Sequence, residues 1–472
     1  MIALRDNSPT MTDTPAAHLA QIYRAQREFF ATHATRPVAF RIEQLKRLRE
    51  AMKKHERRLL DALHADLHKG ETEAYFSEIG ITQSECSHAL AHVGRWAKPQ
   101  RIRPALVQLP SSCWVYPEPL GTTLIIAPWN YSVQLVLAPL VGALAAGNTA
   151  VLKPSEFTPH VSAVLAELVR ESFDPRVVAL VEGDATVSQQ LAALSWDLIF
   201  FTGSTRVGTA IAQSAAANLT PTVLELGGKS PCIVDADVNV EITANRIAWG
   251  KWVNCGQTCV APDYVLVDKK IKQALLGDLT KAVRRFYGDD AQQSKDYGRM
   301  VNAQHFARVQ SYLQQGRVVH GGQVDEAERF IAPTLMTDVD PNSPLMQDEI
   351  FGPLLPVIEY ETLDEAIRFV NARPKPLSLY VFSNNKQVQD RVLSETHSGN
   401  AGVNEVTAQF GSPFMPFGGV GASGMGSYHG RASFDAFSQR RSVLKKSLGL
   451  DPWFRWLPYS KVADRMFRWL LK

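Results

Sequence analysis

Two hydrophobic patterns divide the chain into an N-terminal helical region and a longer region in which strands and helices alternate. Between Arg41 and Gly70 the apolar residues recur mostly at helical spacing, which predicts an amphipathic helix that Gly70 ends. Another helical region is expected to continue through Trp96. The N-terminal part of the chain is therefore predicted to be largely helical.

From Gly121 onward, short apolar segments alternate with helical segments of about 10–15 residues. The segments TTLIIAP, TAVLKP, RVVALVEG and WDLIFFTGS show no polar alternation, which is typical of parallel strands covered on both faces. Further alternation, including DYVLVD, continues to about Val403. We therefore predict an α/β fold with a Rossmann-like parallel sheet and a second α/β domain. Such sheets bind ligands beyond the carboxyl ends of their strands.

Residues 101–120, RIRPALVQLPSSCWVYPEPL, contain four prolines and alternating apolar residues. Because proline lacks an N–H donor, this segment is expected to be an extended ribbon outside the body rather than a core strand. Unpaired backbone groups along such a ribbon suit docking onto another subunit. An oligomerisation arm is predicted here.

Length, composition and charge exclude several classes of protein. At 472 residues, with 45% hydrophobic and 21% charged residues, the chain has room for two or three soluble domains or subdomains. A net charge of +3 without a long basic face does not favour nucleic acid as a partner. No apolar run reaches the ~18–20 residues that a membrane span needs.

Cysteine usage bears on the cellular compartment. The five cysteines are odd in number and lack disulfide-framework spacing, which indicates a reducing environment. The N-terminal residues lack the apolar core of a signal peptide. A cytoplasmic protein is therefore expected.

The segment VNCGQTCV, residues 253–260, places two cysteines four residues apart. A structural zinc site would need a second Cys or His pair, which the sequence lacks, so no metal is expected. Two buried, inert cysteines remain one interpretation. The other is a nucleophile with a neighbouring cysteine, which requires a low-pKa thiol in a polar pocket, a general base and an oxyanion site.

Two residues at predicted strand ends could supply the base and the oxyanion site. Glu225 in LELGGKSP stands beside two glycines, where the backbone can approach a ligand closely. Asn130 in APWNY stands at the carboxyl edge of another strand, and a neutral amide with two N–H bonds is a good oxyanion donor. Taken singly, Glu225 would be a solvated acid and Asn130 a turn or cap residue.

Two glycine-rich segments compete as a nucleotide site. GGVGASG, residues 418–424, contains a literal G-x-G-x-x-G, but SPFMPF rather than a strand precedes it, so it is weak evidence. FFTGSTRVGTAIA, residues 200–212, fails that motif but combines a strand, a turn and a helix. Its helix start and the hydroxyls of Ser204 and Thr205 would suit a pyrophosphate. A tight turn without a ligand is the alternative.

Seven segments between about residues 115 and 440 occur in a recognisable order: PWN, LKPSE, FTGST, LELGGKSP, GQTC, EIFGP and PFGGVGASGMG. With them the chain resembles the NAD(P)-dependent aldehyde dehydrogenase superfamily. The segments CVAPDY, KPLSLYVFS and GSYHGRASFD are similar to those of its class 3 branch. Seven ordered motifs are far more specific than any one of them.

The resemblance implies that three residues are catalytic. Cys259 would be the nucleophile and Glu225 the general base, while the Asn130 side chain and the Cys259 backbone N–H would form the oxyanion hole. Cys255 is expected beside Cys259 in the pocket without a catalytic role. Ser132, where relatives often have proline, departs from the family pattern and concerns only the local turn.

The resemblance also implies a cofactor site for NAD, with NADP as a second choice because class 3 relatives often accept it. Glu156 favours NAD, since a carboxylate binds a ribose 2′-OH and repels a 2′-phosphate. The resemblance implies that Lys153 and Glu156 lie at the adenosine ribose, and Gly203 and Ser204 at the pyrophosphate. Glu349 and Phe351 would lie at the nicotinamide end. Three further cofactor-binding residues are implied: Trp129, Thr205 and Gly208.

The implied activity is oxidation of an aldehyde to its carboxylic acid through a Cys259 thiohemiacetal and thioester, with Glu225 activating the hydrolytic water. Medium- or long-chain aliphatic or aromatic aldehydes are the expected substrates, and a homodimer is the expected assembly. A CoA-acylating or semialdehyde-reducing relative, a cysteine hydrolase and a recruited, non-catalytic enzyme fold are the alternatives.

The resemblance implies three parts. Residues 1–100 and 121–226 would form an NAD(P)-binding domain, and residues 227–415 a catalytic domain. Residues 101–120 and 416–472 would form an oligomerisation arm and a C-terminal tail. The last 22 residues, DPWFRWLPYSKVADRMFRWLLK, are aromatic and basic, and several apolar side chains share roughly one helical face. Packing of this tail against its own or a partner subunit is expected, and peripheral membrane contact is the alternative.

Overall fold

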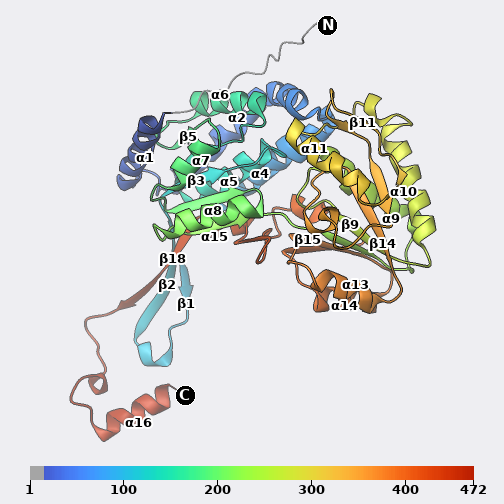
Figure 1. Cartoon of the computed structure of the whole chain (residues 1–472). Coiled ribbons are helices and arrows are strands. Elements are labelled where there is room, and N and C mark those ends of the chain that lie inside the picture. Colours follow the sequence, from blue (N-terminus) through green and yellow to red (C-terminus); the bar gives the residue numbers. More distant parts are fainter. Residues whose placement is uncertain (1–14, 472) are drawn as a thin grey trace.

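The computed structural model describes residues 15–471, so residues 1–14, on which the expectation of no signal peptide rests, lie outside it. Two α/β lobes lie side by side, and an arm projects from the first lobe (Figure 1). The predicted fold class, a parallel-sheet α/β protein with a second α/β unit, is confirmed.

The first lobe is built on a six-stranded sheet with the order β17-β7-β6-β3-β4-β5. The strands from β7 to β5 are parallel and only β17 is antiparallel. Nearly all their residues are buried, as expected of strands covered on both faces. The bounds are β3 (Thr122–Ile126), β4 (Thr149–Lys153), β5 (Val178–Leu180), β6 (Leu198–Thr202), β7 (Thr222–Glu225) and β17 (Gly424–Met425).

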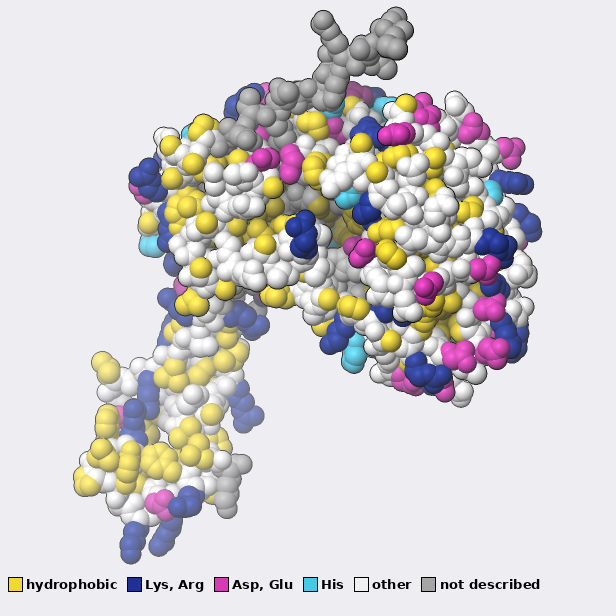
Figure 2. Space-filling view, viewed as in Figure 1, with side chains coloured by type: hydrophobic (Ala, Val, Ile, Leu, Met, Phe, Trp, Pro, Cys, Tyr) yellow, Lys and Arg dark blue, Asp and Glu magenta, His cyan; other side chains and the backbone are white. Residues whose placement is uncertain are grey.

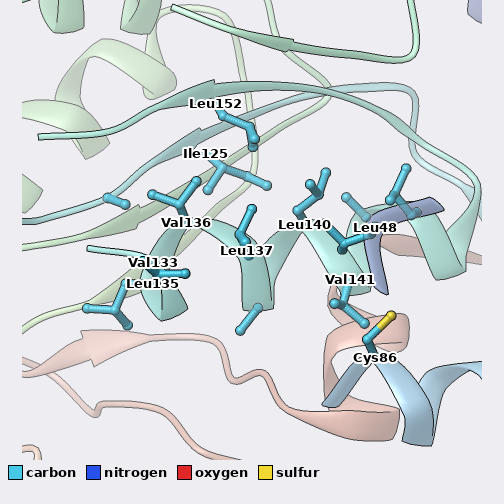
Figure 3. Packing of buried hydrophobic residues seen from close by; sticks show 14 of the residues in the cluster. Leu48, Cys86, Ile125, Val133, Leu135, Val136, Leu137, Leu140, Val141 and Leu152 are labelled. Atoms are coloured by element: carbon cyan, nitrogen blue, oxygen red, sulfur yellow. The ribbon is translucent and has the colours of Figure 1, made fainter. Parts of the chain in front are cut away.

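Helix α5 (Gln134–Ala146) forms the centre of the core of this lobe. Every residue of α5 is buried, as is typical of a helix that is apolar all round. Ile125 of β3 and Leu152 of β4 pack on one side of it, and Cys86 of α4 (Ile81–Trp96) lies on the other (Figure 3). The remaining helices of the parallel sheet are α6 (Pro159–Ser172), α7 (Ala185–Ala192) and α8 (Thr205–Ala216).

The N-terminal region is helical as predicted, but its long helix ends earlier than expected. Helix α2 (Val38–Leu67) ends with His68 in the left-handed conformation, φ 54°, and Gly70 instead precedes the next helix. A hydrogen bond from His68 N to His64 O closes the helix end, so the stop does not need a glycine. The other helical segments are α1 (Ala16–Ala31), α3 (Glu71–Ala74) and the π-helical turn η1 (Tyr75–Gly80).

The second lobe contains a seven-stranded sheet with the order β10-β13-β14-β9-β8-β15-β16, antiparallel only at β10. Its strands are β8 (Pro231–Val234), β9 (Tyr264–Asp268), β10 (Arg317–His320), β13 (Thr334–Thr337), β14 (Leu354–Tyr360), β15 (Ser378–Phe382) and β16 (Asn400–Val403). Its main helices are α9 (Val240–Trp252), α10 (Lys272–Tyr287), α11 (Ala303–Ser311), α13 (Leu363–Asn371) and α14 (Lys386–Glu395).

The arm is a three-stranded antiparallel sheet of β1 (Gln100–Ile102), β2 (Ser111–Pro119) and β18 (Ser438–Lys446). The predicted ribbon of residues 101–120 supplies the first two strands. Helix α16 (Lys461–Leu470) lies beyond the sheet at the far end of the arm, where it contacts the turn η2 (Leu106–Gln108) (Figure 1). None of the helices within residues 15–471 combines the length and apolar character needed to cross a membrane.

Residues 416–437, grouped above with the arm and tail, belong structurally to the first lobe. Strand β17 pairs with β7, with Gly424 opposite Glu225, and α15 (Gly430–Ala436) packs against α5. Gly424 has φ 138°, and a Cβ on it would collide with the carbonyl oxygen of Leu224. The glycines of this segment therefore permit close packing of two backbones, and Gly419, Gly421 and Gly424 do not line the cavities described below.

Candidate active site

Two cavities meet at Cys259, near the junction of the lobes. One, of about 280 Å³, is lined by polar and apolar groups of both lobes and is called the polar cavity below. The other, of about 330 Å³, is lined mainly by apolar side chains. Cys259 contributes to both walls, and Figure 2 shows a hollow between the two lobes. A group on Cys259 can therefore meet ligands from two directions.

A strained turn between α9 and β9 presents Cys259. Within the turn η3 (Val253–Gly256), Asn254 and Cys255 both have φ 54°, and Gly256 has φ 72°. A Cβ on Gly256 would collide with the carbonyl oxygen of Gly352, which explains the glycine in GQTC. Burial and the nearby carboxylates of Glu349 and Glu225 raise the pKa of the Cys259 thiol. This raised pKa differs from the low pKa expected of a nucleophilic thiol, because burial and two carboxylates disfavour the thiolate in the free protein.

Asn130 follows β3 and is held beside the segment that carries Cys259. It is only 2% exposed, and its Nδ2 donates a 3.0 Å hydrogen bond to the carbonyl oxygen of Gln257, two residues before Cys259. One N–H of the amide is used in this contact, so the second N–H is available to an oxyanion. The residue also lines the polar cavity.

Glu225 is the last residue of β7 and lines the same cavity. It is 3% exposed, and neither carboxylate oxygen has a hydrogen-bond partner among the described residues. Burial raises the pKa of this carboxyl group well above its usual value. A carboxyl group in this state can take up and release a proton close to Cys259.

The polar cavity fits a polar cofactor. Besides the Glu225 oxygens, Thr202 Oγ1 and His305 Nδ1 are buried without a partner among residues 15–471, and all three residues line the cavity. Ser204 caps α8 by accepting a hydrogen bond from Val207 N, which places a helix N-terminus at the cavity wall. Such an N-terminus suits the phosphate groups of a dinucleotide.

The opposite wall of this cavity comes from the EIFGP segment. Burial raises the pKa of Glu349 to about 8, and the ring of Phe351 stands edge-on to that of Trp129, 5.3 Å between centroids. A Cβ on Gly227 would collide with the Glu349 carboxylate. The glycine after Leu226 therefore allows Glu349 to approach the strand end that carries Glu225.

The structure brings together eight of the twelve predicted site residues in the polar cavity: Asn130, Glu225 and Cys259, with Trp129, Gly203, Ser204, Glu349 and Phe351. Lys153, Glu156, Thr205 and Gly208 do not line it. Lys153 ends β4, beside β3, and Glu156 Oε2 lies 3.4 Å from Lys153 Nζ. Thr205 Oγ1 donates to the carbonyl oxygen of Ala422.

Gly208 serves helix packing rather than the cavity wall. A Cβ on it would lie 2.5 Å from Leu226 Cδ2, and Leu226 does line the cavity. The glycine therefore lets α8 lie close to the strand end that follows Glu225.

The expected position of Cys255 beside Cys259 in the pocket is wrong. Cys255 is fully buried in the core of the second lobe, where its Sγ lies 3.5 Å from the hydroxyl of Tyr297. The two left-handed residues of η3 turn the chain between the two cysteines, so their side chains enter different environments. Cys255 is a core residue.

Two cavity residues carry no motif in the sequence. His305 and Arg308 lie on α11 and line the polar cavity. Arg308 donates to the carbonyl oxygens of Glu349 and Ile350, so it fixes the EIFGP segment. Burial and the nearby Arg308 lower the pKa of His305 to about 4, so His305 is neutral. Only the packing of α11 against the cavity identifies them.

The second cavity is apolar and leads to Cys259 from the other side. The rings of Phe76 and Trp249 lie 6.1 Å apart in a stacked arrangement and are partly exposed. The apolar lining comes from both lobes and includes Phe76, Ile81, Leu135, Trp249, Val253 and Phe410. This wall suits an elongated apolar or aromatic group. Among the described residues, no cluster of His, Cys, Asp or Glu could hold a metal ion.

The chain is similar to known proteins along nearly its whole length. A model described as the aldehyde dehydrogenase family matches residues 5–443. The 4,4'-diaponeurosporen-aldehyde dehydrogenase of Staphylococcus aureus (strain NCTC 8325 / PS 47) is 46% identical over 93% of this chain and 96% of its own. Aldehyde dehydrogenase family 3 member B1 of Homo sapiens is 47% identical over 96% of this chain and 97% of its own.

A solved structure is equally similar. The structure titled "Substrate bound state of Staphylococcus Aureus AldH" superposes with a TM-score of 0.94 at 45% identity. The match covers 96% of this chain and 99% of the other.

Proposed function

The chain belongs to the aldehyde dehydrogenase family and oxidises aldehydes with NAD(P), and from this premise we propose how its residues divide the chemistry. The six-stranded lobe holds the cofactor and the seven-stranded lobe supplies the thiol. The observation that carries the proposal is that Cys259, Asn130 and Glu225 line one cavity.

The first step is loss of the Cys259 thiol proton to solvent and attack of the resulting thiolate on the aldehyde carbonyl carbon, which gives a thiohemiacetal. The oxygen that becomes negative accepts hydrogen bonds from Asn130 Nδ2 and from the Cys259 backbone N–H. One such donor contributes ~3–4 kcal/mol to lowering the barrier. The contact of Asn130 with Gln257 O orients the amide before the aldehyde arrives.

The cofactor fits the polar cavity, where Gly203 and Ser204 would hold the pyrophosphate and Glu349 and Phe351 the nicotinamide end. When bound, NAD(P) supplies the ring that accepts the hydride from the thiohemiacetal carbon. Lys153 and Glu156 would hold the adenosine ribose farther along the same sheet edge. His305, whose buried Nδ1 has no partner among the described residues, would supply a further contact to the cofactor in this cavity.

The second half of the reaction releases the acid. Oxidation leaves a thioester on Cys259, and Glu225 accepts a proton from the water that attacks it. The raised pKa of Glu225 suits proton acceptance, but it also means that the carboxyl group must ionise first. Hydrolysis is therefore expected to speed up as the pH rises toward the pKa of Glu225.

The apolar cavity supports medium- or long-chain aliphatic or aromatic aldehydes as substrates. Each buried CH₂ contributes about 0.8 kcal/mol, so kcat/KM should rise several-fold per carbon in a series of linear aldehydes until the cavity of about 330 Å³ is filled. NADH formation at 340 nm with this series, with and without CoA, tests the function. Aldehyde-dependent NADH formation without CoA supports hydrolytic oxidation, and strict dependence on CoA would favour an acylating enzyme.

Replacing Glu156 by Gln is expected to shift cofactor preference toward NADP by about 10-fold in the ratio of kcat/KM values, because a carboxylate near the ribose repels a 2′-phosphate. Initial rates with NAD and NADP at saturating aldehyde measure this ratio. Glu241→Gln removes an exposed acid from α9 and is the matched control. An unchanged ratio in Glu156→Gln would place the ribose elsewhere.

The arm supports a homodimer. Strands β2 and β18 project away from the lobes, and apolar residues remain exposed on the arm and tail, as the yellow side chains in Figure 2 show. The apolar face of α16 is only partly covered by its own chain, through contacts such as Phe467 with Phe454. We propose that a partner subunit covers the rest.

Light scattering on the full chain and on a chain that ends at Asp451 tests this assembly. A dimer that weakens on truncation supports packing of the tail between subunits. Flotation of the full chain with anionic liposomes, lost on truncation, would instead support a peripheral membrane contact.

We also propose a cytoplasmic location, supported by five cysteines that are all unpaired. Cell fractionation checks it.

A further inference from the structure

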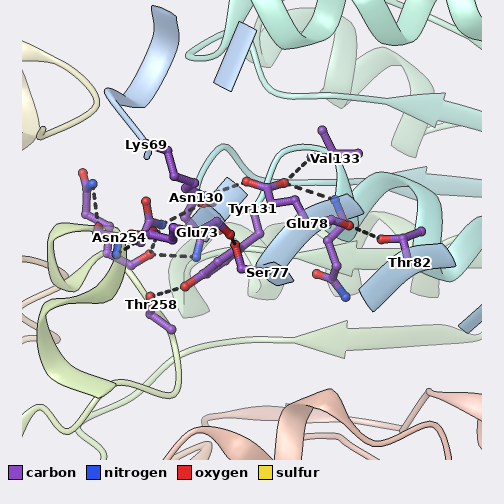
Figure 4. A network of polar contacts seen from close by, with 12 residues as sticks. Lys69, Glu73, Ser77, Glu78, Thr82, Asn130, Tyr131, Val133, Asn254 and Thr258 are labelled. Carbon is purple, nitrogen blue, oxygen red and sulfur yellow. Dashed lines mark hydrogen bonds and ion pairs between the residues drawn. The ribbon is translucent and has the colours of Figure 1, made fainter. Parts of the chain in front are cut away.

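A buried ion pair lies directly behind the loop that carries Asn130. Lys69 and Glu78 are 1% and 0% exposed, and Lys69 Nζ lies 2.6 Å from Glu78 Oε1. The same Nζ donates a 3.1 Å hydrogen bond to the carbonyl oxygen of Asn130 and stands 4.4 Å from the ring centre of Tyr131. Figure 4 shows this network.

Glu78 holds the other end of the same loop. Its Oε2 accepts hydrogen bonds of 2.8 Å from Val133 N and 3.3 Å from Gln134 N. Lys69 therefore donates to a carbonyl group at the start of the loop, while Glu78 accepts hydrogen bonds from two N–H groups at the start of α5. The ion pair bridges the loop from Asn130 to Gln134.

This loop is also tied to the segment that carries Cys259. The hydroxyl of Tyr131 lies 2.7 Å from Thr258 Oγ1, and Asn254 Nδ2 donates to the carbonyl oxygens of both Asn130 and Gln257. Glu73 in turn accepts a hydrogen bond from Asn254 N. The distance between the Asn130 amide and the Cys259 backbone thus depends on a connected set of polar contacts (Figure 4).

A buried ion pair is an expensive way to stabilise a fold, because desolvation of both charges offsets their attraction. Apolar residues of similar size would stabilise a core equally well. An ion pair instead provides directional contacts that fix backbone groups. The position of the ion pair behind Asn130, the oxyanion donor, therefore indicates a role in positioning backbone groups rather than in stability alone.

On the premise of the proposed function, we propose that the Lys69–Glu78 ion pair is a positioning element for aldehyde oxidation, which sets the Asn130 amide relative to Cys259. Neither residue touches the cavity that holds Asn130 and Cys259. Their effect on the reaction passes through Asn130.

The test is a double-mutant cycle between the ion pair and Asn130. Lys69→Met and Glu78→Gln are introduced together, so that neither charge is left buried alone. In the parent background the paired change is expected to lower kcat about 10-fold or more, as small misplacements of catalytic groups do, with KM for aldehyde and NAD(P) within about twofold. In the Asn130→Ala background the same paired change should lower kcat less than about twofold, because the amide that the ion pair positions is absent.

The outcomes separate this inference from the proposed function. If Asn130→Ala alone leaves kcat unchanged, the oxyanion assignment fails. If Asn130→Ala lowers kcat but the paired change does not, or if the two losses multiply fully, the positioning role of the ion pair is overturned. A purely structural role would lower kcat equally in both backgrounds.

A matched control and a second variant complete the design. Lys272→Met with Glu359→Gln removes a 2.8 Å ion pair between α10 and β14 and should change kcat by less than about twofold. Thermal unfolding monitors folding of each variant. If the paired change prevents folding, Lys69→Gln with Glu78→Gln, which keeps polar groups at both positions and leaves no charge unpaired, enters the same cycle, and full multiplication with Asn130→Ala again overturns the proposal.

Discussion

Replacing Cys259 by alanine is expected to lower aldehyde oxidation by roughly 10⁴-fold or more, the scale seen when a nucleophile is removed. The reason is that the thiohemiacetal and the thioester both form on this sulfur, and no other described cysteine lines either cavity. Cofactor binding should persist, because the remaining walls of the polar cavity are unchanged. Steady-state NADH formation and a fluorescence titration with NAD(P) measure the two properties.

Cys255→Ala is the matched control for this prediction. It removes the same functional group four residues earlier, from the core of the second lobe rather than from a cavity. Activity within about twofold of the parent is expected, together with some loss of thermal stability from the smaller side chain. Turnover that survives in Cys259→Ala, or that disappears in Cys255→Ala while the fold persists, would contradict the assignment of the nucleophile.

Replacing Glu225 by glutamine is expected to lower the steady-state rate by about 10²–10⁴-fold, the contribution typical of a general base. Attack by Cys259 and oxidation do not need this carboxylate to activate water, so the first turnover should remain. Rapid mixing should therefore show a burst close to one NADH per subunit, followed by a slow phase. A uniform loss of both phases would contradict a role confined to hydrolysis.

The pH dependence of the hydrolysis rate tests the role of Glu225 independently. Because burial raises the pKa of Glu225, the fraction of ionised carboxylate, and with it the hydrolysis rate of the parent, should increase with pH up to that pKa. Glutamine does not titrate, so the slow phase of Glu225→Gln should lose this rise. A profile of the same shape in parent and variant would remove Glu225 from the titration.

Much of the fold and the catalytic centre could be predicted from the sequence because their signals are local. The strands at Thr122–Ile126 and Leu198–Thr202 are short, uniformly apolar segments between helices. Asn130 and Glu225 follow or end such strands, where parallel sheets place their sites. The resemblance to aldehyde dehydrogenases rested on short motifs at these positions, and the family is confirmed.

The features that were missed depend on contacts between distant segments. Lys69 meets Asn130 across 61 residues, and Arg308 meets the EIFGP segment across 42, with no local pattern in either case. Cys255 was misplaced because two consecutive left-handed residues turn the chain between the cysteines. Residues 416–437 pack onto the first lobe, where glycines such as Gly424 allow β17 to lie against β7.

The thioester on Cys259 can be observed directly. Glu225→Gln, mixed with a linear aldehyde and NAD(P) and quenched in acid, should retain an acyl group, and peptide mass spectrometry should locate it on Cys259. The expected mass increase is that of the acyl group minus one hydrogen. An unmodified Cys259 peptide under conditions that produce the NADH burst, or an acyl group on Cys255 or another residue, would contradict covalent catalysis by this thiol.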